Sequence, residues 1–102
     1  MITNTPNPPY FAVIATSILK EGDNGYRDAA NAMFELASQQ PGFLGMDTAR
    51  QDIGISISYW DTLDSIKAWK ENSMHKETQK MAKDWYKSFR IRICRVEREY
   101  GL

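Results

Sequence analysis

Cysteine and histidine are nearly absent from this chain of 102 residues, which has one of each, Cys94 and His75. A single cysteine excludes an internal disulfide, and one cysteine with one histidine cannot build a zinc site of the usual kind. This scarcity fits a reducing compartment, so we expect a cytoplasmic protein with no bound metal. Cys94 lies in the apolar run 91–96, which predicts a small buried side chain rather than a reactive thiol.

The sequence also lacks an excess of charge and a long apolar run. Thirteen Lys and Arg balance thirteen Asp and Glu, so nothing favours a nucleic-acid partner. No stretch approaches the roughly 20 apolar residues of a membrane span, and residues 1–9 show no secretory signal pattern. We therefore expect no membrane as a partner. A glycine-rich phosphate loop is missing as well, so we expect no bound dinucleotide.

Residues 1–9 read as an extended lead-in, and residues 10–102 as one domain of alternating element types. Branched and aromatic residues predict strands over 10–19, 43–50, 53–60 and 89–99. Apolar residues at helical spacing predict helices over 25–39, 62–71 and 75–86. Pro41-Gly42 ends the first helix, and the short link at 51–54 makes a hairpin of the two middle strands.

The order strand, helix, strand, strand, helix, strand predicts an α+β fold of the ferredoxin-like βαββαβ type. Its natural form is a four-stranded antiparallel sheet with the helices on one face. The strand expected over 10–19 is apolar on both faces, although one of them would then lack helices. A second copy packed sheet against sheet is the simplest cover, so we expect a homodimer.

Three runs in this order resemble the antibiotic biosynthesis monooxygenase domain family. They are Gln40–Gly45, Ser56–Asp61 and Ile66–Lys70, the last continuing to His75. The resemblance covers the chain from Tyr10 to about Tyr100 and implies a dimeric α/β barrel with a pocket between sheet and helices in each protomer. It also implies several possible activities, including oxidation of aromatic compounds by O₂ without flavin or metal, so it does not settle the function.

The haem-degrading branch of this family fits the sequence poorly. That branch pairs a first-strand Asn with a Trp and with an axial His about ten residues beyond it. Trp69 matches the Trp, but Gln79 stands at the ligand position, and Ala15 or Thr16 stands near the Asn position. His75 precedes Gln79 by four residues, about 6 Å along a helix axis. We therefore expect no haem degradation.

His75 and Trp69 are the candidate catalytic residues. His75 is the only side chain whose ordinary pKa lies near neutrality, and it could serve as a general base. The alternative role is capping or packing at a helix start. The family resemblance places Trp69 at a site position, whereas composition alone favours a place in the core for any single tryptophan.

Four further residues are candidates for substrate binding. Aromatic rings stack on planar ligands but are also the usual core fillers of a small domain. Arg92 could contact an anionic substrate, or it could pair with Glu97 or Glu99 nearby. The candidates are Trp60, Trp85, Tyr86 and Arg92.

Two hypotheses of function remain. The first is a cofactor-independent monooxygenase, or a related small-molecule enzyme, that acts on a planar aromatic or quinone-like substrate. The second is a metabolite-binding or stress-related dimer without chemistry. An enclosed cavity reached by His75 would favour the enzyme, and a cavity filled by Trp69, Trp85 and Met81 would favour the second.

Overall fold

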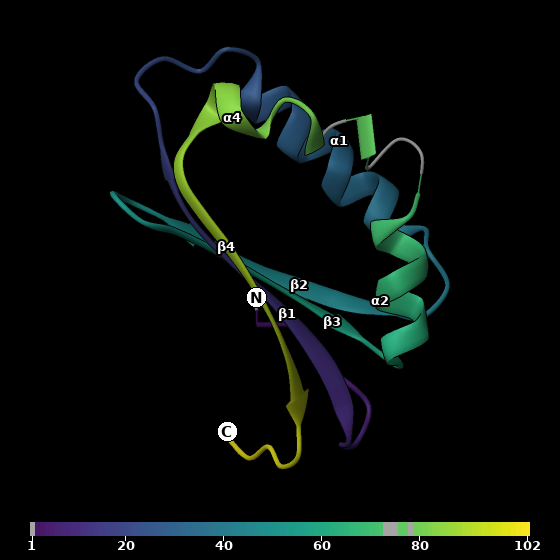
Figure 1. Cartoon of the computed structure of the whole chain (residues 1–102). Helices are drawn as coiled ribbons and strands as arrows, with labels where there is room; N and C mark the ends of the chain where they lie inside the picture. Colours follow the sequence, from purple (N-terminus) through teal and green to yellow (C-terminus); the bar gives the residue numbers. More distant parts are fainter. Residues whose placement is uncertain (1, 73–75, 78) are drawn as a thin grey trace.

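The computed structural model describes residues 2–72, 76–77 and 79–102 of the chain (Figure 1). Its elements in chain order are β1 (Tyr10–Leu19), α1 (Tyr26–Ser38), β2 (Phe43–Arg50), β3 (Gly54–Trp60), α2 (Leu63–Lys70), α4 (Ala82–Trp85) and β4 (Tyr86–Val96). Within the described residues, no helix is long and apolar enough to cross a membrane.

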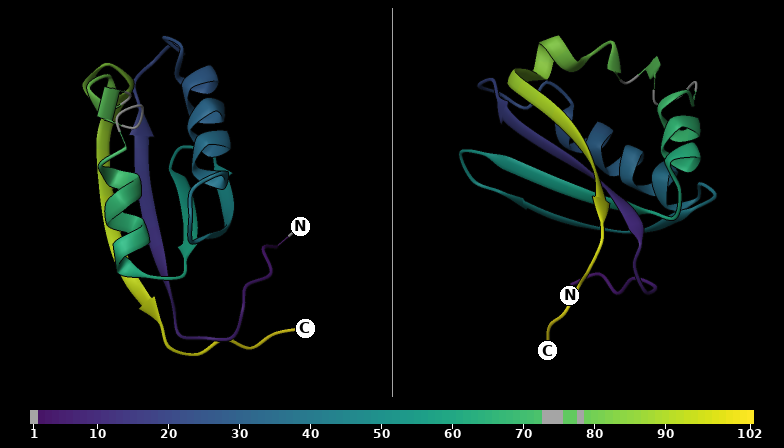
Figure 2. Two further views of the ribbon diagram at one scale, coloured as in Figure 1. Left: turned by 90° about the vertical axis from the view of Figure 1, so that its right-hand side faces the viewer. Right: turned by 60° about the horizontal axis from the view of Figure 1, so that its bottom comes forward.

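The strands form one antiparallel sheet in the order β2-β3-β1-β4. Figure 1 shows α1, α2 and α4 on one side of this sheet, and the turned views of Figure 2 agree. We call the side that carries these helices the inner face and the opposite side the outer face. The predicted ferredoxin-like α+β architecture is confirmed.

Local sequence explains where the first two helices begin and end. Gly25 has a positive φ of 82° directly ahead of α1, a conformation that glycine adopts without steric cost. The hydroxyl of Thr62 accepts a hydrogen bond of 3.0 Å from the backbone N–H of Ser65, which caps α2. Both helices lie within one residue of their predicted ends.

The last strand differs from its predicted bounds. It begins at Tyr86 instead of residue 89 and ends at Val96 instead of residue 99, so Arg98 lies beyond it. The helix predicted over 75–86 partly falls outside the described residues, and of the remainder Ala82–Trp85 forms α4 while Tyr86 belongs to β4. Pairing of β4 with β1 as far as Leu19 extends the strand, with a register shift between Ile18 and Leu19.

The core at one end of the inner face is centred on Trp60. Its side chain has no exposed surface, and its indole N–H donates to the Ser58 hydroxyl over 2.9 Å. The ring stacks on Trp69 of α2 at 6.3 Å between centroids and meets Phe43 of β2 edge-on at 5.4 Å. Trp60 therefore joins α2 to β2 and β3.

The outer face is partly covered by the lead-in. The backbone N–H of Thr3 donates to Asp47 over 2.9 Å, and its hydroxyl donates to the same carboxylate over 2.8 Å. These bonds hold the pKa of Asp47 below its ordinary value. Cys94 lies on this face opposite Ala12 and is half-buried, so it is less buried than the sequence predicted.

Replacing Trp60 with Ala tests the core at its centre. Because the ring is fully buried, we expect Trp60→Ala to lower the free energy of unfolding by about 3–5 kcal/mol. Leu63→Ala is the matched control, since Leu63 lies on α2 and is 53% exposed. Urea unfolding measures both variants, and a loss below about 1 kcal/mol for Trp60→Ala would contradict this account of the core.

Candidate functional site

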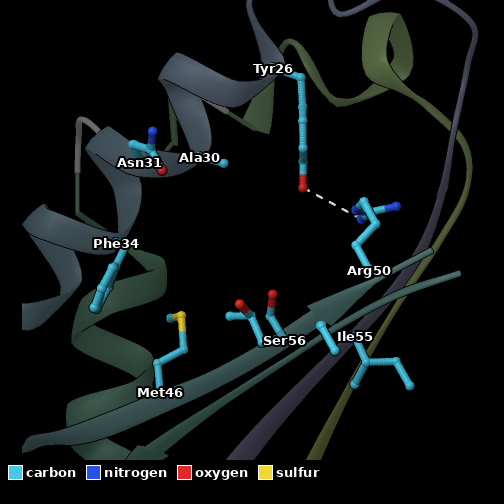
Figure 3. Close-up of a pocket in the computed structure, with 10 residues that line it drawn as sticks. Tyr26, Ala30, Asn31, Phe34, Met46, Arg50, Ile55 and Ser56 are labelled. Carbon is cyan, nitrogen blue, oxygen red and sulfur yellow. Dashed lines mark hydrogen bonds between the residues drawn. The ribbon is translucent and has the colours of Figure 1, made fainter. Parts of the chain in front are cut away.

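A partly open cleft of about 280 Å³ lies between α1 and the strands β2 and β3 (Figure 3). Ligand sites typically measure about 300–1,000 Å³, so this cleft lies just below that range and has room only for a small molecule. Its lining comes from one helix and from the hairpin strands. The lining residues are Tyr26, Ala30, Asn31, Phe34, Met46, Thr48, Ala49, Arg50, Ile55 and Ser56.

The two ends of the cleft differ in polarity. Figure 3 shows Phe34 and Met46 together at one end, and Tyr26 and Arg50 together at the other, with Ser56 between them on the floor. Arg50 carries the formal charge among the lining residues. The cleft therefore offers an apolar surface and a cationic group to the same small ligand.

Arg50 reaches its position because glycine faces it on the next strand. Arg50 pairs with Gly54 of β3, and Gly54 pairs with Ser17 of β1, so the three residues form one row across the sheet. A Cβ at Gly54 would collide with the guanidinium of Arg50. The missing side chain lets Arg50 lie across β3 and donate to the hydroxyl of Ser17 and, over 3.5 Å, to its carbonyl oxygen.

Tyr26 holds the other side of the Arg50 guanidinium. The Arg50 group donates to the Tyr26 hydroxyl over 3.5 Å, and its central carbon lies 5.6 Å from the centre of the Tyr26 ring. Such placement over an aromatic face is a cation–π contact. The charged end of the cleft is thus held from β1 and from α1.

Tyr86 and Trp85 support Tyr26 from the far side. Their rings meet the ring of Tyr26 edge-on, with centroids 5.7 Å and 5.9 Å away. Burial raises the pKa of Tyr86, and the neighbouring Tyr26 hydroxyl raises it further, while Arg50 opposes the shift. The indole N–H of Trp85 donates to the carbonyl of Asn24 over 2.9 Å, which ties this aromatic group to the turn before α1.

The predicted site residues fall into separate places. Trp85 and Tyr86 lie at the polar end of the cleft through their contacts with Tyr26. Trp60 and Trp69 lie together in the core beneath α2. His75 lies outside the described residues.

Arg92 pairs with Ile14 on the outer face, away from the α1 cleft. It lines a shallower hollow of about 180 Å³ there, together with Thr16, Ser17, Ile18, Ile53, Ser88 and Arg90. The structure therefore does not bring Arg92 together with the tryptophans that were predicted to share a site with it.

Sequence reasoning missed Arg50, Gly54, Ser17 and Tyr26. No motif of neighbouring residues identifies these four as a group, since they come from three strands and a helix. One signal was available, because a tight hairpin link places Arg50 directly opposite Gly54. Among the described residues, no group of three or more His, Cys, Asp or Glu side chains is arranged to hold a metal ion.

A ferredoxin-like sheet with a partly open cleft under its first helix defines a small α+β domain with room for a small ligand. A family model described as antibiotic biosynthesis monooxygenase matches residues 9–81. The chain also shares 40% identity over 101 residues with the uncharacterized protein YqjZ of Bacillus subtilis, across 96% of this chain and 89% of that protein. The chain belongs to the antibiotic biosynthesis monooxygenase family.

Solved structures share the fold at low sequence identity. SnoaB, a cofactor-independent oxygenase from Streptomyces nogalater, matches with a TM-score of 0.78 and 8% identity, over 90% of this chain and 97% of that one. PA3566 from Pseudomonas aeruginosa matches with a TM-score of 0.74 and 12% identity, over 93% and 99% of the two chains. Both similarities concern the arrangement of the backbone.

Tyr86→Phe tests the phenol group at the polar end. The unfolded chain releases the Tyr86 proton near pH ~10, whereas the folded chain holds it to higher pH. The free energy of unfolding therefore falls as the pH rises above about 10. We expect Tyr86→Phe to make this fall less steep in urea unfolding measured on both sides of that pH.

Tyr100→Phe is the matched control, because it removes a phenol from a side chain that is 98% exposed. An unchanged alkaline slope in Tyr86→Phe would contradict the structural account of Tyr86.

Proposed function

We propose that this protein is a small-molecule oxygenase that uses O₂ without a flavin or metal and acts on a planar aromatic or quinol-like substrate. The observation that carries the proposal is the cleft with an apolar and a polar end in a chain of the antibiotic biosynthesis monooxygenase family. A ring would lie against Phe34 and Met46, and a hydroxyl would lie toward Tyr26.

The chemistry needs no bound electron carrier, because the substrate supplies the electrons. An activated ring carbon loses a proton, and the resulting anion adds to O₂ to form a carbon–oxygen bond. Loss of water from the hydroperoxide then turns the CH₂ group into a carbonyl, so one oxygen atom enters the product and the other leaves as water. The protein contributes orientation of the ring and a base for the proton.

His75 is the base in this proposal, as the one side chain whose ordinary pKa suits the task. Trp69, whose position in the family motif led to its prediction as a catalytic residue, does not line the cleft, so its proposed role is limited to packing near that base. Both roles are proposals from the sequence, and His75 lies outside the described residues.

A second candidate function has an observation of its own. The residues that line the cleft include no histidine, aspartate or glutamate, so the described lining offers no imidazole or carboxylate as a general base. A cleft of this kind also suits a metabolite-binding protein without chemistry. Oxygen uptake separates the two candidates.

Oxygen consumption is the test of the enzymatic proposal. We expect the purified protein to accelerate O₂ uptake by anthrone, an aromatic ketone with an activated CH₂ group, measured with an oxygen electrode. Ala30→Phe should abolish the acceleration, because Ala30 lines the cleft and a phenyl group would fill it. Ala32→Phe is the control, since Ala32 lies on the same helix but is exposed and does not line the cleft.

His75→Ala tests the base, and we expect a lower rate with the fold retained by circular dichroism. An oxygen-uptake rate that is the same with and without protein would refute the enzymatic proposal and favour the binding protein. Equal rates in Ala30→Phe and the parent would show that the cleft is not the reaction site.

We further propose that two copies pair through their outer faces. Ile18 and Ile55 lie on this face and are 39% and 43% exposed, and Ile14 pairs with Ile57 on the same face, two residues along β3 from Ile55. Adjacent exposed apolar side chains of this kind commonly mark an interface, and a stable pair buries more than about 1,000 Å².

Light scattering tests the pairing. We expect twice the 11.7 kDa mass of one chain at micromolar concentration, and a shift toward the single chain in Ile18→Lys, because Ile18 does not line the cleft and burying a lysine ammonium is costly. Leu63→Lys is the control, since Leu63 is similarly exposed but lies on α2. A single-chain mass for the parent protein would refute the dimer.

A further inference from the structure

We propose that Arg50 selects ligands that carry one anionic group, so that the cleft takes a small amphiphilic acid with an apolar body. The carboxylate or phenolate would lie at Arg50, and the apolar body at Phe34 and Met46. The inference deepens the proposed function, because it names the substrate class of the same cleft. It rests on the geometry around Arg50.

The direction of the Arg50 side chain is set by the sheet. Arg50 stands at the end of β2, a place from which a long flexible side chain would ordinarily extend into solvent. Here it remains exposed but lies across Gly54, where Ser17 on β1 and Tyr26 on α1 hold it. A guanidinium that is held in place loses less conformational entropy when it binds an anion.

The partners of Arg50 leave its charge unpaired. Ser17 and Tyr26 present neutral oxygen atoms. Within the described residues, the ion pairs join Lys80 to Glu77 and Arg95 to Glu97, so no carboxylate there pairs with Arg50. A guanidinium has five N–H donors, and these neutral contacts do not use all of them. The remaining donors are suited to a carboxylate or a phenolate.

The apolar end of the cleft selects for an apolar body in the ligand. Phe34 is 46% exposed, and its ring lies tilted beside Phe43 at 6.5 Å between centroids. Met46 projects toward it from β2 (Figure 3). An inorganic anion would leave this apolar surface in water, and an uncharged ring would leave Arg50 without a partner. A molecule with both parts uses the whole cleft.

Protonation of the ligand should therefore depend on Arg50. An adjacent positive charge favours the ionised form of an acid, so a bound carboxylic acid or phenol keeps its charge at lower pH than in water. A phenol bound in this way is already part of the way to the electron-rich anion that reacts with O₂. Arg50 would thus determine both which ligands bind and whether the bound ligand is protonated or ionised.

Two probes with the same ring test the inference without relying on catalysis. They are 2-naphthoate, which is anionic, and 2-naphthylmethanol, which is neutral, each titrated by isothermal calorimetry. We expect the parent protein to bind 2-naphthoate more tightly. Arg50→Met should weaken 2-naphthoate by roughly tenfold, because a charge-assisted hydrogen bond contributes about 1.5 kcal/mol or more. It should leave 2-naphthylmethanol little changed.

Arg27→Met and Gly54→Ala are the comparison variants. Arg27→Met removes the same charge from an exposed α1 residue that does not line the cleft, and we expect no loss of preference. Gly54→Ala keeps the charge but places a methyl group where the guanidinium lies, so the preference should fall toward that of Arg50→Met. Circular dichroism verifies the fold of each variant.

Equal binding of the two probes by the parent protein, or binding of neither, would overturn the inference. So would equal losses in Arg27→Met and Arg50→Met, which would show a general surface-charge effect. The outcome is separate from that of oxygen uptake. An Arg50-dependent preference without oxygen uptake would refute the enzymatic proposal and support the inference about Arg50. Oxygen uptake without the preference would support the enzymatic proposal and refute the inference about Arg50.

Discussion

The register with which β3 pairs to β1 and to β2 is the constraint on which the rest of the structure depends. In an antiparallel sheet, directly opposite residues share a face, and a slip of one residue would send every side chain to the other face. The observed register sets Ser17, Gly54 and Arg50 in one row on the inner face. The same pairing places Ile14 beside Ile57 on the outer face. One set of backbone hydrogen bonds therefore defines both the cleft and the opposite surface.

Two aromatic groups at opposite ends of the inner face keep the cleft between them. Trp60 and Trp69 fill the space beneath α2, where stacking excludes water. Tyr26, Trp85 and Tyr86 fill the space beneath the start of α1 with edge-on contacts and several polar atoms. The sheet between these groups carries Ser56 and Thr48, which are too short to reach α1, and the cleft lies there.

The order and type of the elements could be predicted from the sequence because they depend on local patterns. Strand alternation, helical spacing and turn residues are properties of neighbouring positions, and they predicted β1, β2, β3, α1 and α2 to within a residue. The early start of β4 could not be predicted, because Tyr86 becomes a strand residue through its pairing with distant Leu19.

The candidate site was harder to predict for the same reason. The prediction of Trp85 and Tyr86 rested on aromatic content alone, which does not distinguish the polar cluster around Tyr26 from the core around Trp60. Arg50 was not predicted as a site residue, because its position depends on the absence of a side chain at Gly54 and on the place of Ser17 in the neighbouring strand. Such a relation between three strands becomes visible only when the register is known.

Thr3 lies beside β2, one of the two edge strands of the sheet. The two outermost strands of an open sheet present unpaired backbone groups that can recruit strands from other chains and lead to aggregation. Beside β2, the hydroxyl of Thr3 shares its proton between Asp47 and the carbonyl of Met46, which lies 3.0 Å away, and a side chain at Gly45 would collide with Thr3. On β4, arginines at 90, 92 and 95 place charge along the opposite border. Both borders thus carry features that oppose edge-to-edge growth.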